Sequence, residues 1–113
     1  MKTAIPLACC LAILSTAAVA TETEPGVAVL QELGRLNGQA LACGETAISG
    51  KARTLTIAHA PKTRRYGEIY EEATNAAFLA QGKSASCPPS AEFTTRLGDI
   101  AGRLQAVLPA GGN

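Results

Sequence analysis

The sequence predicts an all-α fold: a small three- or four-helix bundle, cross-linked by one disulfide, after a cleaved N-terminal signal peptide. Apolar residues recur at helical spacing along most of the chain beyond residue 26, and no stretch of strand length alternates between apolar and polar residues. Two cysteines remain beyond the apolar N-terminus. We expect a helical domain over residues 27–108, between a flexible lead-in at 21–26 and a flexible tail at 109–113.

Residues 1–20 have the features of a signal peptide. Lys2 provides a basic start, an almost wholly apolar or small stretch runs from residue 4 to residue 19, and Ala18-Val19-Ala20 has the small-x-small pattern that signal peptidase recognises. A retained membrane anchor would need roughly 20 apolar residues, and this stretch is shorter and contains Pro6. We therefore expect cleavage after Ala20, a mature chain without an integral membrane span, and export to the bacterial periplasm, with secretion as the alternative.

Cys43 and Cys87 are the cysteines that remain after cleavage, and export places them where disulfides form and persist. Two cysteines allow one intramolecular pairing. Closing a loop of about 44 residues would stabilise the fold by roughly 4 kcal/mol, which is comparable to the whole stability of a small domain. The alternative, a redox-active or metal-binding thiol pair, lacks both a C-x-x-C spacing and a histidine within a turn of either cysteine.

The first helical stretch begins at Val27, ends before Pro61, and forms one helix or two. Pro61 ends it because the residue before a proline is disfavoured in the helical conformation. Gly44 and the Ser49-Gly50 pair are the expected places for a break. The residues that recur at helical spacing along this stretch are Leu30, Leu33, Leu36 or Asn37, Leu41, Ile48, Ala52 and Leu55.

The next helix is predicted over residues 64–81. Thr63 is its expected N-cap, because a threonine hydroxyl can accept a hydrogen bond from a backbone N–H of the first turn, and Gly82 is its expected stop. A loop over residues 82–89 follows and carries Cys87. The residues along one side of this helix are Tyr66, Ile69 or Tyr70, Ala73, Ala77 and Ala80.

The last helix is expected to start with Ser90 as its N-cap and to end before Pro109. It carries the clearest apolar stripe of the chain and two acid–base pairs at i,i+4 spacing, each contributing a few tenths of a kcal/mol. The stripe comprises Phe93, Leu97, Ile100, Leu104, Val107 and Leu108, and the pairs are Glu92 with Arg96 and Asp99 with Arg103.

Four glycines occur as two pairs at i,i+4 spacing, Gly34 with Gly38 and Gly98 with Gly102. A glycine inside a helix costs about 1 kcal/mol relative to alanine, so the pairs indicate that helix backbones approach closely there. We expect the first helix to pack against the last through them. The alternative is a weak homodimer through a glycine face, by analogy with the membrane motif.

A basic segment, defined here as His59, Lys62, Arg64, Arg65 and Tyr66, lies around the predicted start of the second helical stretch, where the helix dipole is already positive. One interpretation is local pairing, of Arg64 with Glu68 and of Arg65 with a carboxylate on a neighbouring helix. The other is a contact site for a small anion or an acidic partner, in which helix N–H groups and arginine side chains converge on a carboxylate or phosphate.

Several functions are disfavoured by composition. Ten Lys/Arg against nine Asp/Glu do not give the strongly basic face of a nucleic-acid-binding protein. His59 is the single histidine, no G-x-S-x-G motif is present, and a zinc site would need four good ligands. Glu68 and Glu72 share a helical face, which we interpret as a solvated acidic face. We expect no catalytic residues, no cofactor, no metal and no nucleic-acid partner.

The layout of the chain resembles the small acid-stress chaperones of the bacterial periplasm, the HdeA-like group, in its signal peptide, short mature chain, single widely spaced cysteine pair and helices throughout. The resemblance covers this layout and not motifs. That group carries a tryptophan and acidic residues around its first cysteine, whereas Cys43 lies in Leu-Ala-Cys-Gly-Glu and the chain has no tryptophan.

The function predicted first is that of a small exported, non-enzymatic helical protein that binds a partner protein or a small anion. An HdeA-like acid-stress chaperone is the alternative. In that case protonation of carboxylates at low pH would loosen the fold and expose apolar helix faces. An enzyme of unknown type is the second alternative.

Overall fold

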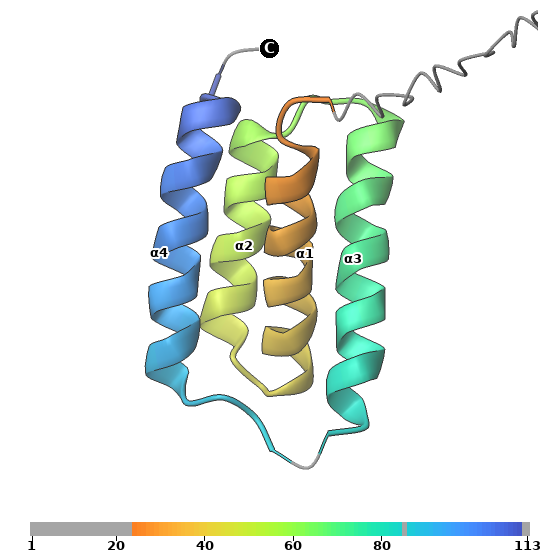
Figure 1. Ribbon diagram of the computed structural model, residues 1–113, viewed down its shortest axis with the longest axis vertical. Helices are drawn as coiled ribbons and strands as arrows, with labels where there is room; N and C mark the ends of the chain where they lie inside the picture. The colour runs from red at the N-terminus through yellow and green to blue at the C-terminus, as the bar shows by residue number, and fades with distance from the viewer. Residues whose placement is uncertain (1–23, 85, 112–113) are drawn as a thin grey trace, which may run out of the picture.

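The computed structural model describes residues 24–84 and 86–111, which form four helices and contain no strand (Figure 1). The helices are α1 (Val27–Ala42), α2 (Thr46–His59), α3 (Arg64–Gly82) and α4 (Ser90–Val107). Cys43 and Cys87 form a disulfide. The predicted all-α bundle with one disulfide is therefore confirmed, whereas the signal peptide predicted at 1–20 lies outside the described residues. Within the described ranges, no helix is long and apolar enough to cross a membrane.

The first helical stretch is two helices, and the break lies at Gly44 rather than at Ser49-Gly50. Gly44 adopts φ 75°, in the left-handed region that favours glycine, and the next amide, of Glu45, donates to the Ala40 carbonyl at 2.8 Å. Gly50 lies inside α2. The stretch ends as predicted, because Ala60 is extended in front of Pro61.

The two predicted N-caps have different outcomes. The Thr63 hydroxyl accepts from the Tyr66 amide at 3.3 Å, which confirms the cap of α3. Ser90 is instead the first residue of α4, its neighbour Pro89 occupies the cap position, and no side chain caps the helix. The prediction of Ser90 as the cap is wrong because the extended residue before the helix is Pro89, and the Ser90 hydroxyl donates to the Glu45 carboxylate at 2.5 Å.

α1 lies between the other helices, with α2 and α4 on one side of it and α3 on the other (Figure 1). α2 and α4 also pack on each other, so α1, α2 and α4 enclose the core, while α3 packs mainly on α1. Tyr66 is the one buried residue of α3. The largest fully buried side chains are Phe93, Leu30, Leu33, Leu36 and Leu104.

α1 and α3 approach each other closely at Gly34 and Gly38. A Cβ atom at Gly34 would lie 2.6 Å from the Tyr70 carbonyl oxygen, and one at Gly38 would lie 2.8 Å from the Phe78 nitrogen. The prediction that α1 packs on α4 through the glycine pairs is therefore wrong in its partner helix, which is α3. A Cβ at Gly98 or Gly102 would meet nothing within 4 Å, because α4 packs through its apolar stripe and these glycines lie off that stripe.

A buried polar chain connects α2, α1 and α3. The Ser49 hydroxyl donates to Asn37 Oδ1 at 2.7 Å, Asn37 Nδ2 donates to Thr74 Oγ1 at 3.2 Å, and the Thr74 hydroxyl donates to the Tyr70 carbonyl at 2.9 Å. Asn37 and Ser49 are buried, so these bonds satisfy groups that would otherwise be costly to remove from water.

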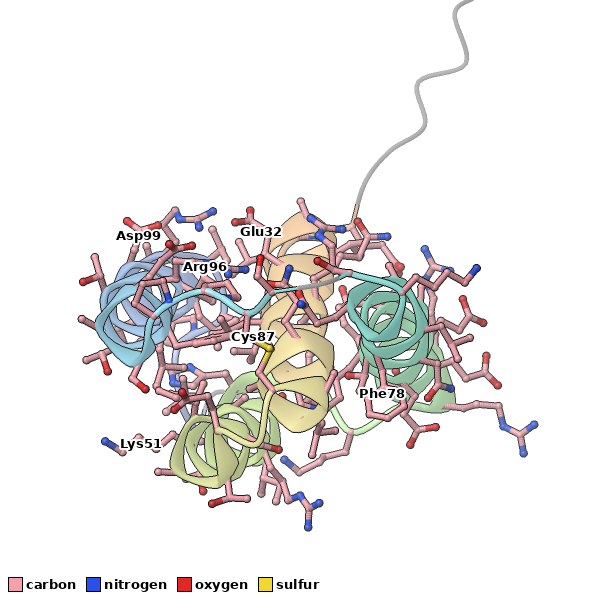
Figure 2. All side chains as sticks on the ribbon, turned by 90° about the horizontal axis from the view of Figure 1, so that it is seen from below. Glu32, Lys51, Phe78, Cys87, Arg96 and Asp99 are labelled. Carbon is pink, nitrogen blue, oxygen red and sulfur yellow. A yellow bond between two sulfur atoms is a disulfide. The ribbon has the colours of Figure 1, made fainter. Side chains whose placement is uncertain are left out.

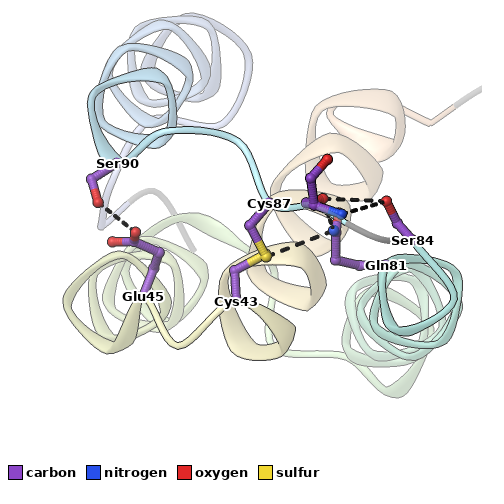
Figure 3. Close-up of a disulfide and its surroundings, with 7 residues drawn as sticks. Cys43, Glu45, Gln81, Ser84, Cys87 and Ser90 are labelled. Atoms are coloured by element: carbon purple, nitrogen blue, oxygen red, sulfur yellow. Dashed lines mark hydrogen bonds between the residues drawn. A yellow bond between two sulfur atoms is a disulfide. The ribbon is translucent and has the colours of Figure 1, made fainter.

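The disulfide joins the end of α1 to the connection between α3 and α4 (Figure 3). The connection is also held by Gln81, whose amide donates to the Ser86 carbonyl at 2.8 Å and to the Cys87 sulfur at 3.8 Å. The bond between Ser90 and Glu45 ties the start of α4 to the α1–α2 turn beside it. This end of the bundle therefore has its helix positions fixed covalently and by hydrogen bonds.

Candidate functional site

The basic segment predicted from the sequence does not form one site in the structure. His59 is buried, and its Nδ1 lies 2.6 Å from the Leu108 carbonyl oxygen. A carbonyl oxygen can only accept, so Nδ1 carries the proton in this bond. His59 thus joins the end of α2 to the residue that follows α4.

The remaining basic-segment side chains are mostly bonded within the protein. Lys62 Nζ donates to a backbone carbonyl at the end of α2, and Tyr66 is buried with its hydroxyl donating to a carbonyl in the lead-in at 3.1 Å. Arg65 pairs with Glu24, which raises the pKa of the arginine, chiefly through that hydrogen bond. The expected carboxylate partner of Arg65 therefore exists but precedes α1, because the lead-in turns past the start of α3.

Arg64 is exposed, and the expected pair with Glu68 is not formed: within the described residues no carboxylate lies within 4.0 Å of Arg64. A hollow of about 210 Å³ beside this segment includes Lys62 alone of the five predicted residues. The rest of its wall is Thr56, Ile57, Ala60, Pro61, Thr63 and Gly67.

An open groove of about 810 Å³, larger than this hollow, lies between α3 and α4, with α1 as its floor. It exists because α3 packs on α1 and does not close against α4. Figure 2 shows Glu32, Arg96 and Asp99 on the groove side of the molecule and Lys51 of α2 on the opposite side. The groove is lined by Glu32, Arg35 and Gln39 of α1, by Ala77, Ala80, Gln81 and Ser84 of α3 and the following turn, and by Thr95, Arg96, Asp99, Ile100 and Arg103 of α4.

Arg103 holds the two carboxylates of the groove. Its Nη1 and Nη2 each donate to a Glu32 oxygen at 2.7 Å, and Nη2 also lies 2.9 Å from an Asp99 oxygen. This bidentate geometry is the strong form of an arginine–carboxylate contact. The Arg103 hydrogen bonds lower the pKa of Glu32, against the opposing effect of partial burial, and the pKa of Arg103 is raised in turn. Glu32 and Arg103 are therefore both charged at neutral pH, and the contact ties α1 to α4.

The remaining positive charge of the groove belongs to Arg35 and Arg96. Within the described residues, Arg35 has no carboxylate oxygen within 4.0 Å, and the nearest to Arg96 is that of Glu92, at 4.0 Å. The Arg96 guanidinium also lies over the Phe93 ring, 5.8 Å from its centre. Both positive charges act on the Glu32 carboxylate and help to lower its pKa. The i,i+4 pairs predicted in the last helix are both present.

Neutral polar residues also line the groove. The Gln39 side-chain oxygen is buried and has no hydrogen-bond partner, and the Ser84 hydroxyl donates to the Ser86 carbonyl at 3.2 Å. Across the part of the chain that the structure describes, no three His, Cys, Asp or Glu residues are grouped so that they could hold a metal ion. The groove is therefore best equipped to bind charged and polar groups along its length.

The sequence interpretation missed this groove, although two signals pointed toward it. Small residues recur on α3 at Ala73, Ala77 and Ala80, and Ala73 and Ala77 lie against Gly34 and Gly38. A helix that packs through small residues on one side, with polar residues elsewhere, is expected to have a single packing partner.

No protein-family model, curated protein or solved structure matches the chain.

Proposed function

We propose that the protein is an exported, non-enzymatic binding module that holds a helical segment of a partner protein in the groove between α3 and α4. The observation that carries the proposal is the groove itself, whose volume of about 810 Å³ lies in the range of binding sites.

The shape of the groove favours a helix as its occupant. Its lining residues recur three, four or seven positions apart on each helix, such as Glu32, Arg35 and Gln39 on α1 and Arg96, Asp99 and Arg103 on α4. At 1.5 Å per residue, each row is about 10 Å long and runs along its helix axis. A helix of two or more turns, laid parallel to these rows, would contact all three walls, as in other helix-in-groove complexes.

The groove is a better candidate than the basic segment. Four of the five basic-segment side chains bond to other parts of the chain, so a small anion would have to replace those bonds. Arg35 and Arg96, in contrast, face an open groove. Export is supported by the apolar N-terminus of the sequence and by a disulfide of the kind that persists in oxidising compartments.

The test is site-specific photo-crosslinking in living cells. A photoreactive amino acid replaces Ala80, which is exposed in the groove, or Ala47, which is exposed on α2 outside it. We expect a discrete cross-linked product from position 80 and none from position 47. If position 80 gave no cross-linked product, or gave the same products as position 47, the groove would be excluded as a partner site. If the protein is exported with cleavage after Ala20, N-terminal sequencing of the protein purified from cells should begin at Thr21.

An HdeA-like acid-stress chaperone is the second candidate, favoured by the acid-sensitive contact between α1 and α4. Glu32 must be ionised to accept both Arg103 hydrogen bonds at full strength, and α3 already exposes Phe78 and Leu79. Acid loosening would add to this apolar surface. The test is whether the protein suppresses aggregation of an unrelated client protein at about pH 3; a client that aggregates as it does alone excludes this function.

A further inference from the structure

We infer that the partner helix is acidic: its carboxylates pair with Arg35 and Arg96, and its small apolar side chains face α3. This inference rests on the proposed function, because it specifies what occupies the groove.

The charge distribution in the groove carries the inference. Three arginines and two carboxylates line it, and Arg103 engages both carboxylates. The lining therefore has a net positive charge of one, and Arg35 and Arg96 are the arginines that Arg103's contacts leave available to a ligand. Neither guanidinium has a carboxylate closer than 4.0 Å among the described residues. A partner carboxylate at Arg35 would break no existing ion pair, and one at Arg96 would compete only with the 4.0 Å contact to Glu92.

The α3 wall of the groove, opposite α4, determines which side chains the rest of the partner helix can have. The α3 residues that line the groove include Ala77 and Ala80 and no charged residue. Short side chains on this wall allow another helix to approach closely, and Ile100 adds apolar surface on α4. The partner helix is accordingly amphipathic, with one acidic and one apolar face.

A nucleic acid does not fit this groove, because Glu32 and Asp99 line it and would repel a continuous row of phosphates. An acidic helix avoids this repulsion, because its carboxylates can be spaced so that they meet Arg35 and Arg96 alone. The sequence of charges along the groove therefore favours a peptide with discrete acidic positions.

The test uses three synthetic helical peptides of about 18 residues, a length that sustains a helix in alanine-rich sequences. Each has an apolar face of alanine and leucine, and the opposite face carries Glu, Gln or Lys at the same positions. Binding of each fluorescently labelled peptide to the oxidised full chain is measured by anisotropy. We expect the Glu peptide to bind about tenfold more tightly than the Gln peptide, as two partly exposed ion pairs allow, and the Lys peptide to bind most weakly.

Matched charge variants test whether the preference arises in the groove. R35Q/R96Q should remove the preference for Glu over Gln, whereas K51Q/R53Q, which removes the same charge from α2, should leave it unchanged. The single variant R35Q keeps the test valid if loss of Arg96 from the Phe93 ring disturbs the fold, and it should reduce the preference by about threefold. Added salt should weaken the Glu peptide more than the Gln peptide.

The outcomes separate the inference from the proposed function. Equal binding of the Glu and Gln peptides would overturn the acidic inference and leave the groove as a helix site. Binding of none of the three peptides, together with no cross-link at position 80, would overturn both. Self-association that R35Q/R96Q abolishes would assign the groove to a second copy of this chain and overturn the assignment to a partner protein.

Discussion

Replacing Gly38 by alanine should destabilise the protein, while the same change at Gly102 should stabilise it. Alanine is favoured over glycine inside a helix by about 1 kcal/mol, and at Gly102 nothing within 4 Å opposes this gain. At Gly38 the added Cβ would lie 2.8 Å from the Phe78 nitrogen and closer still to the Thr74 carbonyl oxygen. These are backbone atoms, so α3 must move as a whole, and overpacking of this kind costs about 1–3 kcal/mol.

The same movement would stretch the hydrogen bond between Asn37 and Thr74, which contributes about 1 kcal/mol. After subtraction of the helix-propensity gain, G38A should be destabilised by about 1–3 kcal/mol, so the two variants should differ by about 2–4 kcal/mol. Urea unfolding of the oxidised protein, followed by far-UV circular dichroism, measures both. If G38A proved as stable as G102A, the close approach of α1 and α3 would be refuted.

Three further predictions concern other contacts. Reducing Cys43–Cys87, which are 44 residues apart, should lower the free energy of unfolding by up to about 4 kcal/mol in urea titrations with and without reductant. N37L should cost about 1–3 kcal/mol in the same assay, because it leaves the buried Ser49 hydroxyl without its acceptor and removes the amide that donates to Thr74. Glu32 has a pKa below its usual value near 4.5 in the folded protein, so the native state binds its proton less readily than the unfolded state. Its stabilising effect is therefore complete above that value and lost as the pH falls through the folded pKa, and E32Q should show a smaller loss of stability between neutral pH and acid.

Most helix boundaries were predictable because short-range chemistry sets them. Thr63 can cap α3 with its own side chain, Pro61 excludes helical geometry from its neighbour, and Gly44 adopts the positive φ at which α1 ends. The disulfide followed from the cysteine count once export was assumed. Ser90 was the exception, because Pro89 takes the extended cap position and Ser90 is already helical; its hydroxyl donates instead to Glu45 in the distant α1–α2 turn, a contact that no local pattern indicates.

The candidate site was less predictable because its contacts are long-range in sequence. Helical spacing showed that Gly34 and Gly38 mark a close approach, but it could not identify α3 as the neighbour. His59 and Leu108 are 49 residues apart, and Arg103 and Glu32 are 71 residues apart. Local sequence therefore showed the basic residues but not the distant oxygen atoms that accept their hydrogen bonds. Arg103 was correctly paired with Asp99 at i,i+4 spacing, while its stronger contact with α1 required the fold.

The mode of packing of α3 explains both the stability and the groove of this protein. Gly34 and Gly38 bring α3 so close to α1 that Ala73 and Ala77 contact α1. The side of α3 that lines the groove has only short or polar side chains, which do not reach α4. The width of the groove then depends on two constraints that flank it: the glycine contact, which holds α3 against α1, and the Arg103–Glu32 contact, which holds α4 against α1. The disulfide fixes the connection between α3 and α4 to the same helix. Each wall is thus held against α1, and the groove does not depend on extensive packing between α3 and α4.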